Sequence, residues 1–100
     1  MRVYRAVSLE EYADLQTMGR FRPGVNSLLG KWFADSYDGV LLHAKAHYPD
    51  GRSRIVATDI PDHRLPELYR VSNLDGLSDS SYIYPEMLND FPPILEVEDG

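Results

Sequence analysis

The stretch 30–48, GKWFADSYDGVLLHAKAHY, decides the fold, because a short apolar run leads directly into a helical pattern. The run at 31–35 predicts a buried strand. Ser36 can then cap a helix, since a serine hydroxyl accepts a hydrogen bond from a free N–H group of the first turn. Apolar residues recur on one face of that helix: Tyr37, Val40, Leu41, Ala44 and Tyr48. A strand joined to a helix in this way predicts a domain that mixes both kinds of element.

The segment before this stretch repeats the same order of strand and helix. Residues 3–7 alternate small or branched apolar residues with larger polar ones, which is typical of a strand. Ser8 and Glu11 have the spacing of a capping box, and Gly19 ends the pattern that follows. The apolar positions of this helix are Leu9, Tyr12, Leu15 and Met18. We expect a first strand followed by a first helix.

Shorter elements follow, after a turn-rich loop at 20–29. The apolar run at 53–60, closed by Pro61, predicts a central strand, and 73–76 is a turn. Residues 82–84 form a further expected strand, Pro85 begins a one-turn helix, and 94–97 form a last strand. The chain is therefore expected to be a single α+β domain over residues 1–100, with two main helices and a small sheet.

Composition narrows the function classes. The 100 residues are 43% hydrophobic and 26% charged, as in an ordinary folded domain, and no apolar run is long enough to cross a bilayer. The net charge of −6 disfavours general nucleic-acid binding and membrane-surface binding. The chain has no cysteine, so it lacks a thiolate nucleophile and a disulfide framework. We expect no membrane partner and a cytoplasmic location, or delivery into a target cell.

Common catalytic motifs are incomplete in this sequence. His43 and His47 lie four residues apart and would share a helix face, but the remaining histidine, His63, falls in a loop, so no metal site is expected. No Gly-x-Ser-x-Gly elbow positions a serine nucleophile, and no glycine-rich phosphate loop is present. If the chain is an enzyme, its chemistry comes from another arrangement.

Arg5 and the block at 30–36 are the candidates for ligand binding. An arginine held on a rigid strand presents a planar fork of donors that suits a diphosphate or a ribose, although Arg5 could simply face outward from its strand. The block adds the aromatic residues Trp32 and Phe33 and, at the strand end, the hydroxyl of Ser36. That hydroxyl could orient a ligand amide or a ribose hydroxyl. Burial in the core is the alternative for the two aromatic side chains.

Taken together, the blocks YRAVS (4–8), GKWFA (30–34), NLDG (73–76) and SYI (81–83) resemble a known family. Their order resembles the small C-terminal toxin domains of bacterial polymorphic toxins, of the Rhs and contact-dependent inhibition types. In its layout the chain is also similar to the ADP-ribosyltransferase fold. The likeness covers nearly the whole chain.

This resemblance implies a split sheet that clamps NAD, as substrate, between its halves. Arg5 matches the first-strand arginine that contacts phosphate or ribose, and Ser36 matches the serine of the second motif. Trp32 stands where related enzymes place a ring near nicotinamide, with Tyr4 and Phe33 as neighbouring NAD-binding residues. A cognate immunity protein is the implied partner.

The family's third motif is a glutamate, whose carboxylate stabilises the oxocarbenium-like transition state as nicotinamide leaves. The alignment places Ser81 at that position, and serine cannot supply the charge. Glu86 lies just past the same strand, and Glu96 with Glu98 has the Glu-x-Glu spacing of arginine-modifying members. We take Glu86, with Arg5 and Ser36, as the predicted catalytic set.

Three hypotheses remain open from the sequence. The first is an NAD-dependent ADP-ribosyltransferase or NAD glycohydrolase. The second is a metal-free ribonuclease toxin domain that uses arginine, histidine and tyrosine side chains. The third is a non-catalytic module that binds a protein partner, for which the missing glutamate is the motive.

Overall fold

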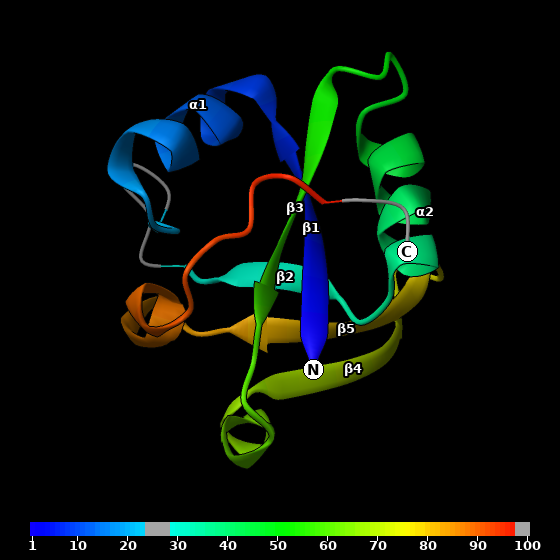
Figure 1. Cartoon of the computed structure of the whole chain (residues 1–100). Coiled ribbons are helices and arrows are strands. Elements are labelled where there is room, and N and C mark those ends of the chain that lie inside the picture. The colour runs from blue at the N-terminus through cyan, green and yellow to red at the C-terminus, as the bar shows by residue number, and fades with distance from the viewer. Residues whose placement is uncertain (24–28, 98–100) are drawn as a thin grey trace.

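A computed structural model describes residues 1–23 and 29–97, and in these ranges the chain forms one five-stranded antiparallel sheet with helices between its strands. The strand order is β3-β1-β2-β5-β4 (Figure 1). The elements are β1 (Arg2–Ser8), α1 (Leu9–Met18), β2 (Lys31–Ala34), α2 (Tyr37–His47), β3 (Ser53–Asp59), the 3₁₀ helix η1 (Asp62–Glu67), β4 (Tyr69–Leu74), β5 (Ser78–Ile83) and the 3₁₀ helix η2 (Pro85–Asp90). The α+β class is therefore confirmed. The predicted loop at 20–29 lies partly outside the described residues, and Glu98 lies wholly outside them.

Both α-helices begin where the sequence predicts, and α1 also ends at the predicted glycine. The Ser8 hydroxyl accepts a hydrogen bond from the Glu11 backbone N–H at 3.1 Å, and Gly19 ends α1 in the left-handed conformation at φ 69°. The Ser36 hydroxyl accepts from the Gly39 N–H at 3.0 Å and caps α2. These local signals fix how each strand enters its helix.

The sheet consists of two halves that are joined along a short seam. β1 and β3 pair over seven residues, from Arg2 opposite Asp59 to Ser8 opposite Ser53, and β2 pairs with β5 over four. Between β1 and β2 the register contains one pair, Tyr4 opposite Ala34. Figure 1 shows β1 and β3 running across the direction of β2, β5 and β4. Beyond the residue pair Tyr4 and Ala34, β1 and β2 no longer pair. The half formed by β3 and β1 therefore separates there from the half formed by β2, β5 and β4.

The hydrophobic core fills one side of the sheet under α1 and η2. The rings of Phe21 and Phe33 meet edge to face there, with centroids 5.1 Å apart. Its buried members are Val3, Val7, Leu15, Phe21, Phe33, Val56, Ile60, Leu68, Ile83, Met87, Leu88 and Phe91. α2 contributes no residue to this core cluster. It packs against β1 instead, where the ring centroids of Tyr37 and Tyr4 lie 5.8 Å apart.

Two expectations about strands are wrong. The strand at 53–60, predicted to be central, is the edge strand β3. Val56 and Ile60 are buried in the core, and residues 92–94 cover the outer edge of the strand: the Thr58 hydroxyl donates to the carbonyl of Pro92, and Ala57 exchanges two backbone hydrogen bonds with Ile94. That exchange is a single bridge in place of the predicted strand at 94–97. Pro92 and Pro93 lack an N–H, so a ladder cannot extend before Ile94.

The helices are short. None in the described part of the chain is long and apolar enough to cross a membrane.

Candidate functional site

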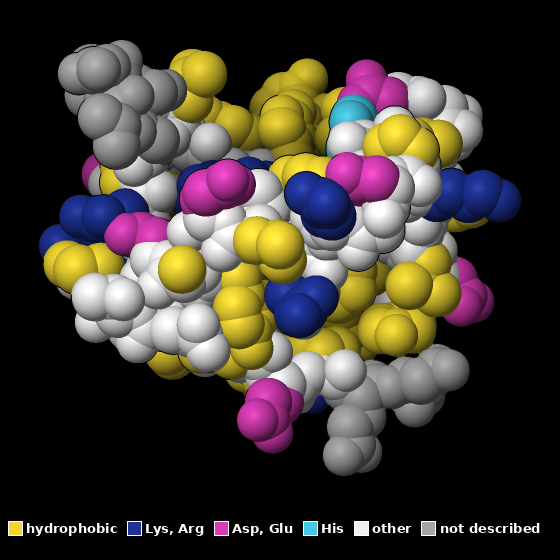
Figure 2. All heavy atoms as spheres, turned by 90° about the horizontal axis from the view of Figure 1, so that it is seen from above, with side chains coloured by type: hydrophobic (Ala, Val, Ile, Leu, Met, Phe, Trp, Pro, Cys, Tyr) yellow, Lys and Arg dark blue, Asp and Glu magenta, His cyan; other side chains and the backbone are white. Residues whose placement is uncertain are grey.

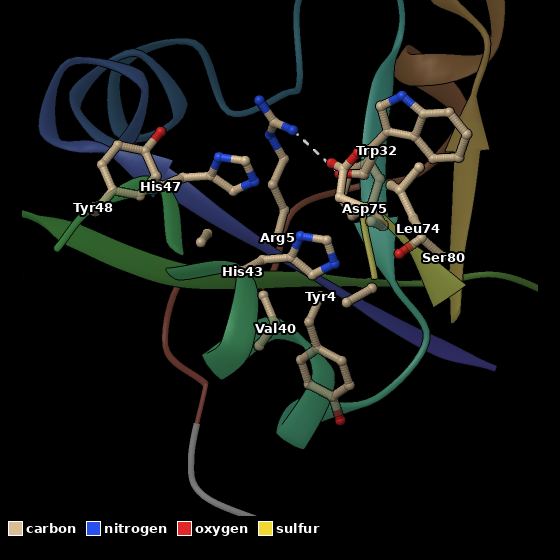
Figure 3. A pocket seen from close by; sticks show the side chains of 13 residues that line it. Tyr4, Arg5, Trp32, Val40, His43, His47, Tyr48, Leu74, Asp75 and Ser80 are labelled. Atoms are coloured by element: carbon tan, nitrogen blue, oxygen red, sulfur yellow. Dashed lines mark hydrogen bonds between the residues drawn. The ribbon is translucent and has the colours of Figure 1, made fainter. Parts of the chain in front are cut away.

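A cavity of about 370 Å³ opens where β1 separates from β2 (Figure 3). Its volume lies within the roughly 300–1,000 Å³ of small-molecule sites. The wall contains residues of both halves of the sheet, of α2 and of the β4–β5 turn, among them Tyr4, Arg5, Trp32, His43, His47 and Asp75. Segments far apart in the sequence therefore supply polar groups to one hollow.

Arg5 bridges the open seam. Its Nη1 donates to the backbone carbonyl of Trp32 at 3.1 Å, so a side chain contacts β2 where the strands themselves no longer pair. Its Nε and Nη2 donate to the two carboxylate oxygens of Glu11, each at 2.9 Å. This bidentate geometry is the strong form of an arginine–carboxylate pair. Arg5 is thus held rigidly at the cavity and does not simply face outward.

The charge around Arg5 is not balanced. Lys31 Nζ lies 3.4 Å from the same Glu11 carboxylate, so two cations share one anion and leave one positive charge in excess. The side chain of Lys31 is only 11% exposed. Burial, and then the charge of Arg5, hold the pKa of Lys31 below its usual value. This cluster would stabilise an anion beside Arg5, whereas Asp75, on the same cavity wall, would oppose it.

Trp32 forms part of both the cavity and a neighbouring aromatic groove. The groove is lined by Trp32, Tyr69, Val71, Leu74, Tyr82 and Tyr84. The indole meets Tyr69 edge to face at 6.1 Å and lies 5.1 Å from the tilted ring of Tyr82. Phe33 points to the opposite face of β2, where its side chain is buried in the core. Trp32 is thus the aromatic side chain of this strand that a ligand can reach.

The two histidines of α2 stack against each other at the cavity, with ring centroids 5.8 Å apart and planes 11° from parallel. His43 Nε2 lies 2.9 Å from the Ser78 hydroxyl of β5. Burial, and then the neighbouring His47, lower the pKa of His43, against the opposing charge of Asp75. His43 therefore remains neutral to a lower pH than an ordinary histidine.

α2 approaches β5 closely enough to form this contact because residue 39 is a glycine. A Cβ at Gly39 would lie 2.7 Å from Ser78 Cβ, which is closer than real contacts allow. The absence of that atom brings the helix onto the strand and places His43 beside Ser78.

The predicted site residues separate into two groups. The four predicted NAD-binding residues, Tyr4, Arg5, Trp32 and Phe33, all border the cavity, Phe33 with a buried side chain. Ser36 and Glu86 do not border it: the Ser36 hydroxyl caps α2, and Glu86 lies in the first turn of η2. Their catalytic roles stay predictions.

Ser81, at the position where a glutamate was expected, is fully buried on β5 opposite Phe33. Its hydroxyl donates to Asp35 at 2.8 Å, and Asp35 also pairs with Arg70. Ser81 therefore supports the end of β2 and does not reach the cavity.

Asp75 is the acidic residue of the cavity wall, and sequence reasoning missed it. It lies in the turn between β4 and β5 with φ 55°, and both Asn73 and Gly76 of the same turn also have positive φ. The sequence predicted this turn at 73–76 but could not show which part of the molecule the turn faces.

For His43 and His47, helical spacing predicted a common face, but the sequence could not show which element lies opposite that face. Among the described residues, no group of three or more His, Cys, Asp or Glu side chains could hold a metal ion.

Comparison with known proteins identifies no relative: no family model, curated protein or solved structure matches the chain. A function for this protein must therefore be argued from the cavity itself.

Proposed function

We propose that the protein binds NAD in this cavity and breaks the bond between nicotinamide and ribose, passing ADP-ribose to water or to an acceptor. The observation that carries the proposal is the open seam between β1 and β2, where a rigidly held arginine borders a cavity. A cleft between two halves of a sheet is also what the resemblance implies.

Arg5 supports binding of the diphosphate. Three of the five N–H groups of a guanidinium are used in its hydrogen bonds to Glu11 and Trp32, so two remain for a ligand. The excess positive charge that Arg5 and Lys31 share over Glu11 adds attraction for an anion. A phosphate oxygen beside Arg5 would receive charge-assisted hydrogen bonds, which are stronger than neutral ones.

Trp32 supports binding of the nicotinamide. A flat cationic ring is attracted to the face of an indole, and a tryptophan is the best aromatic partner for such a charge. Loss of that positive charge as the bond breaks would weaken the contact with the product. Trp32 therefore favours release of nicotinamide after cleavage.

The reaction also needs a carboxylate near the ribose. The sequence predicts Glu86, whereas Asp75 lies on the cavity wall. The geometry favours Asp75, because charge stabilisation of an oxocarbenium-like transition state requires direct approach to the reacting carbon. We expect Asp75→Asn to abolish nicotinamide release and Glu86→Gln to leave it unchanged. The reverse result would return the role to Glu86.

The proposal is tested by NAD binding to the purified protein and to a matched pair of arginine variants. Trp32 is the only tryptophan of the chain, so its fluorescence reports directly on the cavity. NAD should quench it, and Arg5→Ala should abolish the quenching. Arg2→Ala is the control, because Arg2 lies on the same strand and forms the same bidentate pair, with Asp59, outside the cavity. Equal quenching in all three proteins, or none in any, would contradict NAD binding.

The toxin setting and the immunity protein rest on the resemblance. We expect expression of the chain in a bacterial cytoplasm to arrest growth and to deplete NAD, and Arg5→Ala to relieve both effects. Growth at the normal rate with undiminished NAD would count against this setting.

A metal-free ribonuclease is the second candidate, because His43 and His47 share the cavity with Arg5. Two imidazoles and a guanidinium can move protons and stabilise charge during phosphodiester cleavage. The surface does not favour a polynucleotide: basic and acidic side chains alternate on the face seen in Figure 2 and form no broad basic patch there. RNA cleavage that His43→Ala abolishes would support the ribonuclease. Intact RNA would exclude it, and a protein that neither binds NAD nor cleaves RNA would fit the binding module.

A further inference from the structure

The side chain of His43 is positioned to act on the nucleophile of the proposed reaction. We infer that Nδ1 of His43 is the general base that accepts the proton of the attacking water or acceptor hydroxyl. This inference rests on the proposed function and deepens it, since it gives a proton-transfer role in NAD cleavage to a histidine that lies outside the predicted catalytic set.

The general-base role requires the neutral ring of His43 to carry its hydrogen on Nε2. The Ser80 hydroxyl donates to the backbone carbonyl of Ser78 at 3.3 Å, which uses its single proton. In the contact of 3.4 Å between the two serine hydroxyls, Ser78 is then free to act as the donor. With the Ser78 proton directed to Ser80, the Ser78 hydroxyl accepts from His43 Nε2 at 2.9 Å, which is the arrangement that the inference assigns.

This tautomer leaves Nδ1 with a free lone pair. Nδ1 makes no hydrogen bond within the described residues, whereas Nε2 is anchored on β5. Figure 3 shows the ring of His43 extending from α2 into the space beside Arg5. The serine contact holds the ring and directs its basic nitrogen to where a ligand would bind.

The groups around His43 tune it for this task. His47 faces it from α2 itself, Asp75 from the β4–β5 turn, and Arg5 with Tyr4 from β1; Tyr48, just after α2, completes the wall. Burial and the charge of His47 lower its pKa, while Asp75 raises it. The lowered pKa favours the neutral imidazole that a general base needs, and Asp75 would stabilise the imidazolium once it forms.

The step balances without any further reactant. The bond between the ribose C1′ and the nicotinamide nitrogen breaks, and its electron pair stays on nicotinamide. The water oxygen forms a bond to C1′ as Nδ1 takes one of its protons, and that proton later leaves for solvent. The products are ADP-ribose, nicotinamide and one proton, as hydrolysis of NAD requires.

Activity and binding are measured together on His43→Gln, with His63→Gln as the control. His63 lies exposed on η1, away from the cavity. We expect His43→Gln to bind NAD as the unsubstituted protein does, and to release nicotinamide about 100-fold more slowly, since a general base contributes at least that much. The fall in rate toward acid pH should also disappear from the residual activity.

These outcomes separate the inference from the function on which it rests. Unchanged nicotinamide release by His43→Gln would overturn the general base and leave the NAD-cleaving function standing. Failure of the unsubstituted protein to bind or cleave NAD would overturn both.

A second measurement needs no substrate. Nitrogen-15 NMR of the imidazoles should show His43 protonated at Nε2 in the unsubstituted protein, and Ser78→Ala should remove that preference while Ser72→Ala leaves it. Ser72 lies on the exposed part of β4. A hydrogen on Nδ1 in the unsubstituted protein would contradict the assignment, because the lone pair would then face Ser78.

Discussion

The two edges of β1 differ sharply. Along one edge, seven consecutive residues pair with β3, and along the other a single residue pairs with β2. On the paired edge the backbone satisfies its own polar groups. On the open edge, a side chain satisfies a backbone carbonyl instead, because Arg5 donates to the carbonyl of Trp32 across the gap.

This difference separates side chains that fill the core from charged side chains that gather at the open seam. Side chains of the paired strands, such as Val3 and Val56, are completely buried and hold the core together. The open seam carries three ionisable groups with restricted access to water, namely Arg5, Glu11 and Lys31. Charges are costly to desolvate, so their presence at the seam suits ligand binding better than stability.

The largest effect is expected from Glu11→Gln, which breaks the open seam. Glutamine keeps the shape but leaves Arg5 and Lys31 as unpaired, partly buried cations, and the free energy of unfolding should fall by about 3 kcal/mol. Urea denaturation measures the change. Asp59→Asn, at the exposed pair with Arg2, is the control and should cost less than about 1 kcal/mol.

The same carboxylate makes the stability depend on pH. Burial alone would raise the pKa of Glu11, but Arg5 and then Lys31 outweigh it and hold this pKa below its usual value of 4.5. The unfolded chain therefore binds more protons in this range, and the stabilisation is lost as pH falls below about 4.5. Glu11→Gln should flatten the pH dependence of unfolding there. An unchanged slope would show that the seam does not depend on this charge.

The next largest loss of stability is expected from a substitution at the paired edge of β1. Val56 is completely buried on β3, so Val56→Ala should leave a cavity and lower the free energy of unfolding by about 2 kcal/mol. NAD affinity, measured by Trp32 fluorescence at a temperature where the variant is folded, should not change. A matching loss of affinity would show that the two edges are not separate in function.

The smallest effect is expected from Gly39→Ala, at the point where α2 approaches β5. The added methyl group would push α2 away from Ser78, at a cost of about 1–3 kcal/mol that better helix propensity offsets by about 1 kcal/mol. The main consequence is a displaced His43, so nicotinamide release should slow more than NAD binding weakens. Unchanged release would mean that the approach of α2 to β5 does not position His43.

Local signals predicted much of the fold. Ser8, Gly19 and Ser36 act on backbone groups within a few residues, so the sequence alone placed both helices correctly. The strand at 53–60 was given the wrong place in the sheet, because a distant segment at 92–94, and not another strand, covers its outer backbone edge. An apolar pattern indicates that the side chains of a strand are buried, but it does not indicate which segments lie beside that strand in the sheet.

The cavity was predicted less completely for the same reason. Arg5 and Trp32 stand out on neighbouring strands, and both border the cavity. Asp75 belongs to a turn and His43 to a helix, and their approach to Arg5 depends on the separation of β1 from β2. That separation has no local sequence signal, because it is a property of how the pair β3–β1 crosses the three strands β2, β5 and β4.

The most direct test of NAD binding at the open seam is a titration of the nitrogen-15-labelled protein with NAD, followed by amide chemical shifts. We expect shifts to concentrate along the open seam and the elements around it, at Arg5, Trp32, His43 and Asp75, while amides of β3 such as Val56 stay unchanged. No shifts at millimolar NAD, or shifts confined to residues outside the cavity, would contradict NAD binding at this seam.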